Sequence, residues 1–193
     1  MKFSLIVILL SLLYNQNLLI NSQVKSYLDK LETDFDEILF VSIDNQKMYH
    51  FKKQKIISTY VISSSKYGVG NQSGSNKTPK GLHFIKNKIG DNTPINGKMI
   101  GRKFTGEIAK IFSDKTISDT DDITTRILWL SGLEVGLNKG KNIDSFKRYI
   151  YIHGTSEEGR LGIPSSHGCI RMKNKDVIDL YKKVEVGTLV LIL

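Results

Sequence analysis

The sequence is poor in the residues that mark several common classes of protein. Among its 193 residues there are one cysteine, Cys169, and three prolines. A disulfide framework is therefore excluded, and the low proline content argues against a disordered chain. Paired Cys/His fingers, arginine-rich helices and aromatic ribonucleoprotein motifs are also missing, so no nucleic-acid partner is indicated. Hydrophobic residues make up 40% of the chain, enough for one domain with a packed core.

Acidic residues are scarce in one part of the chain. The formal charge is +9, and between positions 45 and 110 thirteen Lys or Arg residues accompany only Asp91 and Glu107. A basic surface of this kind attracts polyanions, such as an anionic cell-wall polymer or anionic lipid. The alternative is a lysine-rich soluble surface that has no partner.

No apolar run in the sequence is long enough for a comfortable membrane span. The run at residues 3–14 follows Lys2 and is broken by polar residues at 15–17. A positive start and a short hydrophobic stretch indicate a secretory signal, whereas a spanning helix needs about 20 apolar residues. We therefore expect an export signal at 1–22, a lead-in segment at 23–37 and one domain at 38–193, located in the periplasm or cell envelope. Residues 20–22 match the small-x-small cleavage pattern poorly, so an uncleaved anchor is the alternative.

Hydrophobic periodicity predicts a mainly β domain of the α+β class, with one helix near the C-terminus packed on a sheet. Residues 113–125 are expected to form an acidic surface excursion, and residues 127–133 fit either a buried strand or a helical turn. Asn174 is expected to cap a helix over residues 175–184. Part of the lead-in segment also has helical spacing. Strands are predicted at 38–43, 48–52, 56–63, 81–89, 148–152 and 188–193, the first two forming an antiparallel hairpin.

Three residues with catalytic potential, His153, His167 and Cys169, lie in the last fifth of the chain. A thiol is a weak nucleophile near neutral pH until a base or a positive environment favours the thiolate. An imidazole within hydrogen-bond reach can act as that base and can then protonate a leaving amine. The intervening loop is long enough to fold back, so either histidine could meet the thiol.

Glycines stand beside these residues at positions 154 and 168. Without a Cβ they allow sharp turns and close approach to a ligand, and the backbone N–H groups of Gly168 and Cys169 could form an oxyanion hole. Two alternatives stay open on residue type alone. Cys169 could be a buried, inert residue, or it could join the two histidines in a zinc site, which would lack a fourth ligand.

The residues around Cys169 resemble the signature of the L,D-transpeptidase catalytic domain family, also called YkuD-like. That signature is a histidine, a loop, and then Ser/Thr-His-Gly-Cys followed by an aliphatic residue and Asn or Arg. The chain has His153 and then Ser-His-Gly-Cys-Ile-Arg at 166–171, and Thr-Pro-Lys-Gly-Leu-His-Phe at 78–84 is similar to an upstream family strand. The resemblance extends from about 38 to 193 and implies a mixed-sheet sandwich of the L,D-transpeptidase catalytic type.

By this resemblance Cys169 is the nucleophile and His153 the base, with the Gly154 carbonyl orienting the imidazole. The resemblance assigns oxyanion and substrate contacts to Ser166, His167, Gly168 and Arg171, and it implies no cofactor and no metal. The loop before Ser166 is slightly shorter than the commonest family form, which bears on the choice of acceptor.

The implied activity is peptidoglycan L,D-transpeptidation. Cysteine acyl transfer would take an acyl group from a tetrapeptide stem to the amine of a diamino acid on a second stem, which forms 3→3 cross-links. The same site could instead serve an L,D-carboxypeptidase or hydrolase, or the attachment of a lipoprotein to peptidoglycan or its detachment. From another class, the chain could be a wall-binding module with an idle thiol.

Three lesser signals concern packing. Trp129 is expected in the core or in the wall of a groove, since aromatic side chains are mostly buried. His50 and His83 are expected to be surface or packing residues of strands. Tyr149 and Tyr151 alternate with isoleucines and are predicted to line one face of a strand.

Overall fold

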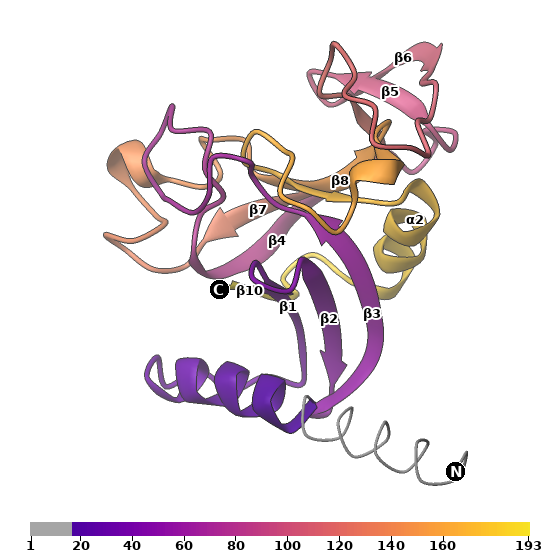
Figure 1. Cartoon of the computed structure of the whole chain (residues 1–193). Helices are drawn as coiled ribbons and strands as arrows, with labels where there is room; N and C mark the ends of the chain where they lie inside the picture. The colour runs from indigo at the N-terminus through magenta and orange to yellow at the C-terminus, as the bar shows by residue number, and fades with distance from the viewer. Residues whose placement is uncertain (1–16) are drawn as a thin grey trace, which may run out of the picture.

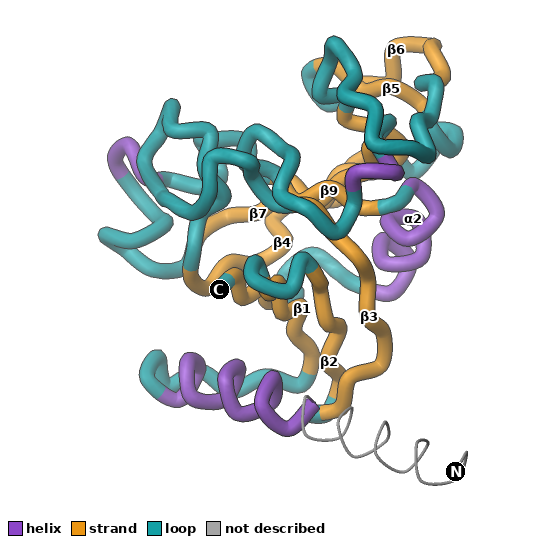
Figure 2. The backbone as a smooth tube through the Cα atoms, viewed as in Figure 1, coloured by secondary structure: helices purple, strands orange, loops and turns teal. Residues whose placement is uncertain are grey.

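A computed structural model of the protein describes residues 17–193 (Figure 1). Most of the predicted export signal therefore lies outside the described residues. The described chain contains a helix at 17–29, ten strands, two short 3-10 helices and a second α-helix, and Figure 2 separates these elements from the long connecting loops. The bounds are β1 Glu37–Ser42, β2 Lys47–Lys52, β3 Lys55–Ser63, β4 Gly81–Ile89, β5 Gly97–Ile100, β6 Lys103–Ile108, β7 Ile123–Gly132, η1 Lys141–Ile143, β8 Tyr151–Thr155, η2 Glu158–Arg160, β9 Ile170–Met172, α2 Asn174–Lys183 and β10 Leu189–Ile192.

The strands form one mixed sheet that closes on itself. Its order is β4-β10-β1-β2-β3-β9-β8-β7-β5-β6, and an additional pairing joins β4 to β7. The β1–β10 and β8–β9 pairs are parallel, whereas the other strand pairs are antiparallel. The predicted mainly β fold with a mixed sheet is confirmed, and so is the hairpin of β1 and β2. The β5–β6 hairpin extends from this closed sheet at upper right in Figure 1.

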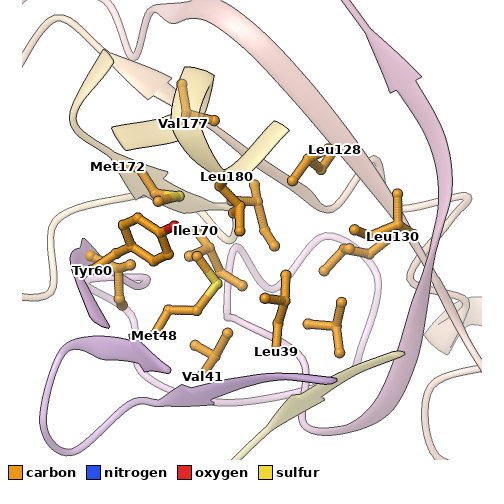
Figure 3. Close-up of a cluster of buried hydrophobic side chains, with 14 of the residues drawn as sticks. Leu39, Val41, Met48, Tyr60, Leu128, Leu130, Ile170, Met172, Val177 and Leu180 are labelled. Atoms are coloured by element: carbon orange, nitrogen blue, oxygen red, sulfur yellow. The ribbon is translucent and has the colours of Figure 1, made fainter. Parts of the chain in front are cut away.

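The main core lies inside the closed sheet, where apolar side chains alternate inward along the strands. Figure 3 shows side chains from both halves of the sheet meeting the inward face of α2. Ile152 of β8 and Ile170 of β9 are paired in register and are fully buried in this core. Consequently, the residues immediately before and after them point to the opposite face of the sheet. That alternation positions the candidate site.

A second apolar cluster joins the N-terminal helix to the outer side of β1, β2 and β10. Ile20, Val24 and Leu28 are spaced at three to four residues and are all buried, as expected for one face of an amphipathic helix. The helical part of the lead-in segment is thereby confirmed. The helix runs continuously across position 22, the predicted end of the export signal. Cleavage there stays a prediction.

Two predicted boundaries near the site are wrong. The strand expected at 148–152 is β8 at Tyr151–Thr155, so His153 lies in the middle of the strand rather than at its end. Arg148 and Tyr149 belong to a turn in which Tyr149 has a φ of +57°. Strand β9 was not predicted, because a three-residue strand is too short to produce a recognisable alternation.

Helix α2 begins one residue earlier than predicted, and its capping differs. The cap position is Lys173, and Asn174 is the first helical residue, with a buried side chain. The Asn174 amide donates to the Thr155 carbonyl and the Glu158 carboxylate, while its Oδ1 accepts bonds from the hydroxyls of Thr124 and Thr125. Asn174 therefore joins β7, β8 and α2 instead of capping the helix.

Candidate active site

His153 and Cys169 lie on the same face of neighbouring parallel strands. His153 is opposite Arg171 in the β8–β9 register, and Cys169 immediately precedes β9 at the level of Tyr151. The two side chains are thus offset by two residues, about 6.6 Å along the strand direction. The peptide N–H of Tyr151 donates to Cys169 Sγ at 3.4 Å, and Sγ–H donates to the Tyr149 carbonyl at 3.4 Å. These are the hydrogen bonds of the thiol in residues 17–193, and none of them reaches a histidine.

The environment of His153 defines its tautomer. The ring is buried, and its Nδ1 lies 2.7 Å from the carbonyl oxygen of Gly154. A carbonyl can only accept, so Nδ1 carries the proton and Nε2 of the neutral ring has a free lone pair. Burial lowers the pKa of His153, while the charge of Asp121 raises it less. The Gly154 carbonyl contacts the imidazole, which leaves a ring that can accept a proton at Nε2, and its role in orienting the base stays a prediction.

Gly154 is required at its position by close packing. A Cβ built there would lie 2.5 Å from Asn174 Oδ1 and 2.9 Å from the Thr124 carbonyl oxygen. Any side chain would therefore push β8 away from β7 and α2, and it would move the carbonyl that holds His153.

The Cys169 thiol is neutral at rest. It is partly exposed, yet the surrounding protein desolvates it strongly enough that burial raises its pKa to about 12. The Tyr151 N–H, Arg171 and Arg148 oppose this rise, and the charge of Asp121 adds to it. The surroundings of the resting site therefore favour the thiol over the thiolate. Proton transfer must accompany attack on a substrate, because the thiolate is scarce beforehand.

Arg171 is the centre of a buried ionic network. Its side chain is 2% exposed and contacts Asp121 Oδ1 at 2.5 Å and Glu157 Oε2 at 2.7 Å. Burial by itself raises the pKa of Asp121, but Arg171 and the nearby histidines hold it below its usual value. Both terminal nitrogens of the guanidinium contact carboxylates, so Arg171 joins Asp121 to Glu157 beneath the site. The substrate contact expected of Arg171 stays a prediction.

Asp121 is the site residue that the sequence did not reveal. It lies in the segment expected to be only a surface excursion, yet its other oxygen contacts His167 Nδ1 at 2.8 Å. Its carboxylate therefore links the loop before β7 to both His167 and Arg171. The acidic character of 113–125 was the available signal, but four aspartates in that segment did not distinguish this one.

The loop that delivers Cys169 is fixed by hydroxyl groups. Ser166 Oγ donates to the Cys169 carbonyl at 2.6 Å and accepts the Gly168 N–H at 3.2 Å. Thr78, from the upstream segment, donates to the Gly168 carbonyl at 3.1 Å. Gly168 has a φ of +127°, which only glycine adopts easily. Because its N–H is already engaged, Gly168 serves the oxyanion only if Ser166 releases it.

His167 lies at the surface above this loop. Its side chain is 43% exposed, and its ring lies 5.8 Å from the ring of Tyr67. Lys66, His167, Asp121 and Arg171 are among the residues that line a cavity of about 260 Å³ on this side of the site. Within residues 17–193 no three His, Cys, Asp or Glu side chains converge as a metal-ligand set. The structure thus separates the two histidines: His153 is buried on the strand next to Cys169, and His167 lies at the surface in contact with Asp121.

Fold and site together define a closed mixed-sheet domain that presents a histidine and a single cysteine on adjacent parallel strands. A family comparison agrees with this class: the sequence model of the L,D-transpeptidase catalytic domain (YkuD) matches residues 36–192. The chain therefore belongs to the L,D-transpeptidase catalytic domain family, a family of acyltransferases associated with the cell wall.

Curated relatives match over a short segment. The chain is 46% identical over 41 residues to a probable L,D-transpeptidase, YbiS, of Escherichia coli K12, which is 21% of this chain and 13% of that protein. It is 50% identical over 46 residues to the putative L,D-transpeptidase YkuD of Bacillus subtilis, covering 24% of this chain and 28% of the relative. These alignments span less than a third of either relative.

Solved structures share the fold over most of the chain. The catalytic domain of the Enterococcus faecium L,D-transpeptidase, acylated by ertapenem, has a TM-score of 0.50 at 20% identity and covers 83% of this chain and 99% of that one. An L,D-transpeptidase from Xylanimonas cellulosilytica has a TM-score of 0.51 at 16% identity, covering 89% and 69%. At these identities the likeness shows the fold.

Proposed function

We propose that the protein is a peptidoglycan L,D-transpeptidase in which Cys169 is the nucleophile and His153 the base. The observation that carries the proposal is the orientation of His153. Its Nδ1 is committed to the Gly154 carbonyl, so Nε2 is available on the face that also holds Cys169. Membership of the family supports the choice of substrate, a peptidoglycan stem peptide.

The acylation step follows from a neutral thiol and a neutral imidazole. Cys169 Sγ turns from the Tyr149 carbonyl and attacks the carbonyl carbon at the L-centre of the diamino acid, while its proton passes to His153 Nε2. The tetrahedral intermediate then expels D-alanine, whose amine takes the proton from His153, and a thioester remains on Cys169. General acid–base catalysis of this kind contributes about 10²–10⁴-fold.

The second step returns the enzyme to its starting state. The side-chain amine of a second stem attacks the thioester and gives a proton to His153 Nε2. The S–C bond breaks, the thiol recovers the proton, and a 3→3 amide cross-link forms. The thioester keeps the acyl group activated, so the reaction needs no ATP and can occur outside the cytoplasm.

Location and surface charge complete the proposal. We propose that residues 1–22 direct export to the periplasm or cell envelope, where the substrate is found. No helix within residues 17–193 has the length and apolarity to cross a membrane. The basic stretch between 45 and 110 is proposed to contact an anionic wall polymer.

A muropeptide assay with variants tests the chemistry. The full chain, incubated with tetrapeptide muropeptides, is expected to release D-alanine and yield cross-linked dimers detectable by mass spectrometry. Cys169→Ala should abolish both products, and His153→Ala should lower the rate by about 10²–10⁴-fold. His167→Ala is the matched histidine control and should retain part of the activity, because His167 lies at the surface in contact with Asp121.

The products also separate the alternatives. Tripeptides without dimers would indicate a hydrolase, and protein-linked stems would indicate lipoprotein attachment. Full activity of Cys169→Ala, or a larger loss for His167→Ala than for His153→Ala, would contradict the proposed assignment.

A further inference from the structure

An aromatic wall begins directly at the candidate nucleophile. Tyr149 and Tyr151 bond Cys169 through their backbones, and their rings lie 5.7 and 5.5 Å from the ring of Trp129 in β7. Phe146 stacks on Trp129 at 4.0 Å, and its carbonyl accepts the indole N–H. Trp129 is half-buried and packs against the small apolar cluster of Met99, Ile127 and Tyr151. Trp129 contacts each of the other three rings of this wall.

Arg102 lies over this wall from the tip of the β5–β6 hairpin. Its guanidinium is 4.6 Å from the ring centroid of Trp129 and 5.4 Å from that of Tyr149. One of its nitrogens, Nη1, donates to the Tyr151 hydroxyl at 3.3 Å. Gly101 and Arg102 form the turn with φ values of +56° and +67°. A non-glycine residue at positive φ costs of order 1 kcal/mol, so the contacts with the wall offset a local cost.

Arg102 differs from the other four arginines of the chain in having no strong acceptor. Arg171 and Arg160 pair with carboxylates, while Arg126 and Arg148 donate to backbone carbonyls. The ion pairs of the same hairpin belong to Lys98, with Glu107 and Asp122. Within the described residues, the hydrogen-bond and cation–π partners of Arg102 are two aromatic rings and a phenol, and the residue is half-buried.

A guanidinium in this setting is a receptor for a carboxylate. It has five N–H donors in a planar fork that matches the two oxygens of a carboxylate, and one donor direction is used by Tyr151. The contacts with Trp129, Tyr149 and Tyr151 hold the guanidinium in place, and within the described residues no carboxylate occupies its remaining donors. The partial burial strengthens a charged hydrogen bond relative to one in bulk water.

We infer that Arg102 binds a carboxylate of the donor stem peptide and thereby selects substrates that carry that negative charge. This inference rests on the proposed function, because it places a stem peptide on Cys169. Two carboxylates of such a donor are candidates: that of the departing D-alanine, on the residue adjoining the scissile bond, and that at the D-centre, at the far end of the diamino-acid side chain. Both present the same chemistry, and amidating one at a time distinguishes them.

The kinetic test uses three tetrapeptides: the free acid, the C-terminal carboxamide and the D-centre carboxamide. For the free acid, Arg102→Gln is expected to raise KM by about 10- to 100-fold, the range of a charged hydrogen bond, with kcat within about threefold of wild type. One carboxamide should raise KM of the wild type to a similar extent. The Arg102→Gln variant should have similar KM values for that carboxamide and for the free acid. Arg102→Lys should recover only part of the loss, because an ammonium lacks the fork.

The neighbouring Lys103 supplies the matched control. It is exposed on the same hairpin, so Lys103→Gln removes the same charge from the surface and should leave KM within about twofold of wild type. An equal rise in KM for Lys103→Gln would show a general charge effect and overturn the inference. So would an unchanged KM for Arg102→Gln, or equal KM values of the wild type for all three peptides.

A binding measurement separates this inference from the proposed reaction. Calorimetry with the free-acid peptide and Cys169→Ala is expected to show binding that weakens by about 10-fold or more in the double variant with Arg102→Gln. Wild-type protein that binds the peptide through Arg102 but releases no D-alanine would contradict the proposed function alone. Equal binding by the single and double variants would contradict the role of Arg102, whatever the turnover.

Discussion

At the scale of single residues, the site combines a thiol and an imidazole that their surroundings keep uncharged. Cys169 is held as a thiol because burial raises its pKa to about 12, and His153 is held neutral because burial lowers its pKa. A preformed thiolate–imidazolium pair is therefore absent. The reaction must create the charged pair only when a substrate carbonyl is present.

The alkylation rate of Cys169 should reveal this protonation state. Because the pKa lies near 12, the rate with iodoacetamide is expected to rise through pH 7 to 10 without reaching a plateau. The same chain unfolded in urea is the control, with a plateau above the ordinary thiol pKa of about 8.5. A plateau already present near pH 7 in the folded chain would show an ionised thiol and contradict the neutral resting state.

The sequence reveals those site residues that are local to the Cys169 motif. Cys169, His153 and Gly154 stand in a recognisable pattern, and the contact of His153 with the Gly154 carbonyl is as expected. Asp121 escaped because its partners lie about fifty residues further along the chain, and no local pattern marks such a pairing. The burial of Arg171 was missed for the same reason, because an arginine is expected to be exposed unless the two carboxylates that pair with it are known.

At the scale of elements, the local β1–β2 hairpin was predicted and the parallel pair at the site was not. Strands β1 to β4 follow the predicted ranges within about two residues because their alternation and turns are local. Strands β8 and β9 are parallel and joined by a long loop, so their register depends on contacts that no local pattern encodes. That register is what places His153 on the same face as Cys169.

His83 in strand β4 makes the free energy of unfolding depend on pH. The sequence analysis expected it to be a surface or packing residue of a strand. The ring is buried, its Nδ1 contacts the Gly81 carbonyl at 2.9 Å, and its Nε2 contacts the Ser145 hydroxyl at 2.9 Å. The neutral ring satisfies both contacts, by donating from Nδ1 and accepting at Nε2. Burial, chiefly, lowers the pKa of His83 to about 4.

The free energy of unfolding should therefore fall as the pH decreases from about 6.5 to about 4. In that window the unfolded chain binds a proton that folded His83 does not, which corresponds to roughly 3 kcal/mol over the whole window. Above pH 6.5 His83 is neutral in both the folded and the unfolded chain, so this loss of stability is absent. Urea unfolding of wild type and His83→Gln at a series of pH values measures it: the variant should lose distinctly less stability on acidification, and equal losses would contradict this origin.

At the scale of the whole molecule, the N-terminal helix and the β5–β6 hairpin lie at opposite ends in Figure 1. The hairpin carries Arg102 to the site, whereas the helix covers the outer side of β1, β2 and β10. The site therefore depends on the hairpin for specificity and on the helix only through the stability of the domain. This separation allows the two ends to be tested independently.

The N-terminal helix crosses the predicted export boundary at residue 22, so cleavage there would change the stability of the domain. Ile20 is 5% exposed against the domain, while the adjacent Leu19 is 70% exposed. Cleavage after residue 22 would remove Ile20, and the mature domain would lose that part of its apolar contact. Retention of residues 17–22 would preserve it, as in the alternative of an uncleaved anchor.

Ile20→Ala is expected to lower the free energy of unfolding by about 2–4 kcal/mol, since it leaves a cavity against the sheet. Leu19→Ala is the matched control and should change it by less than about 0.5 kcal/mol, because its side chain faces solvent. Urea unfolding of the full chain gives both values, and D-alanine release at saturating substrate should be unchanged in both variants while they stay folded. Equal effects of the two substitutions on unfolding would show that the helix does not pack on the domain through Ile20, and the cost assigned to cleavage after residue 22 would then disappear.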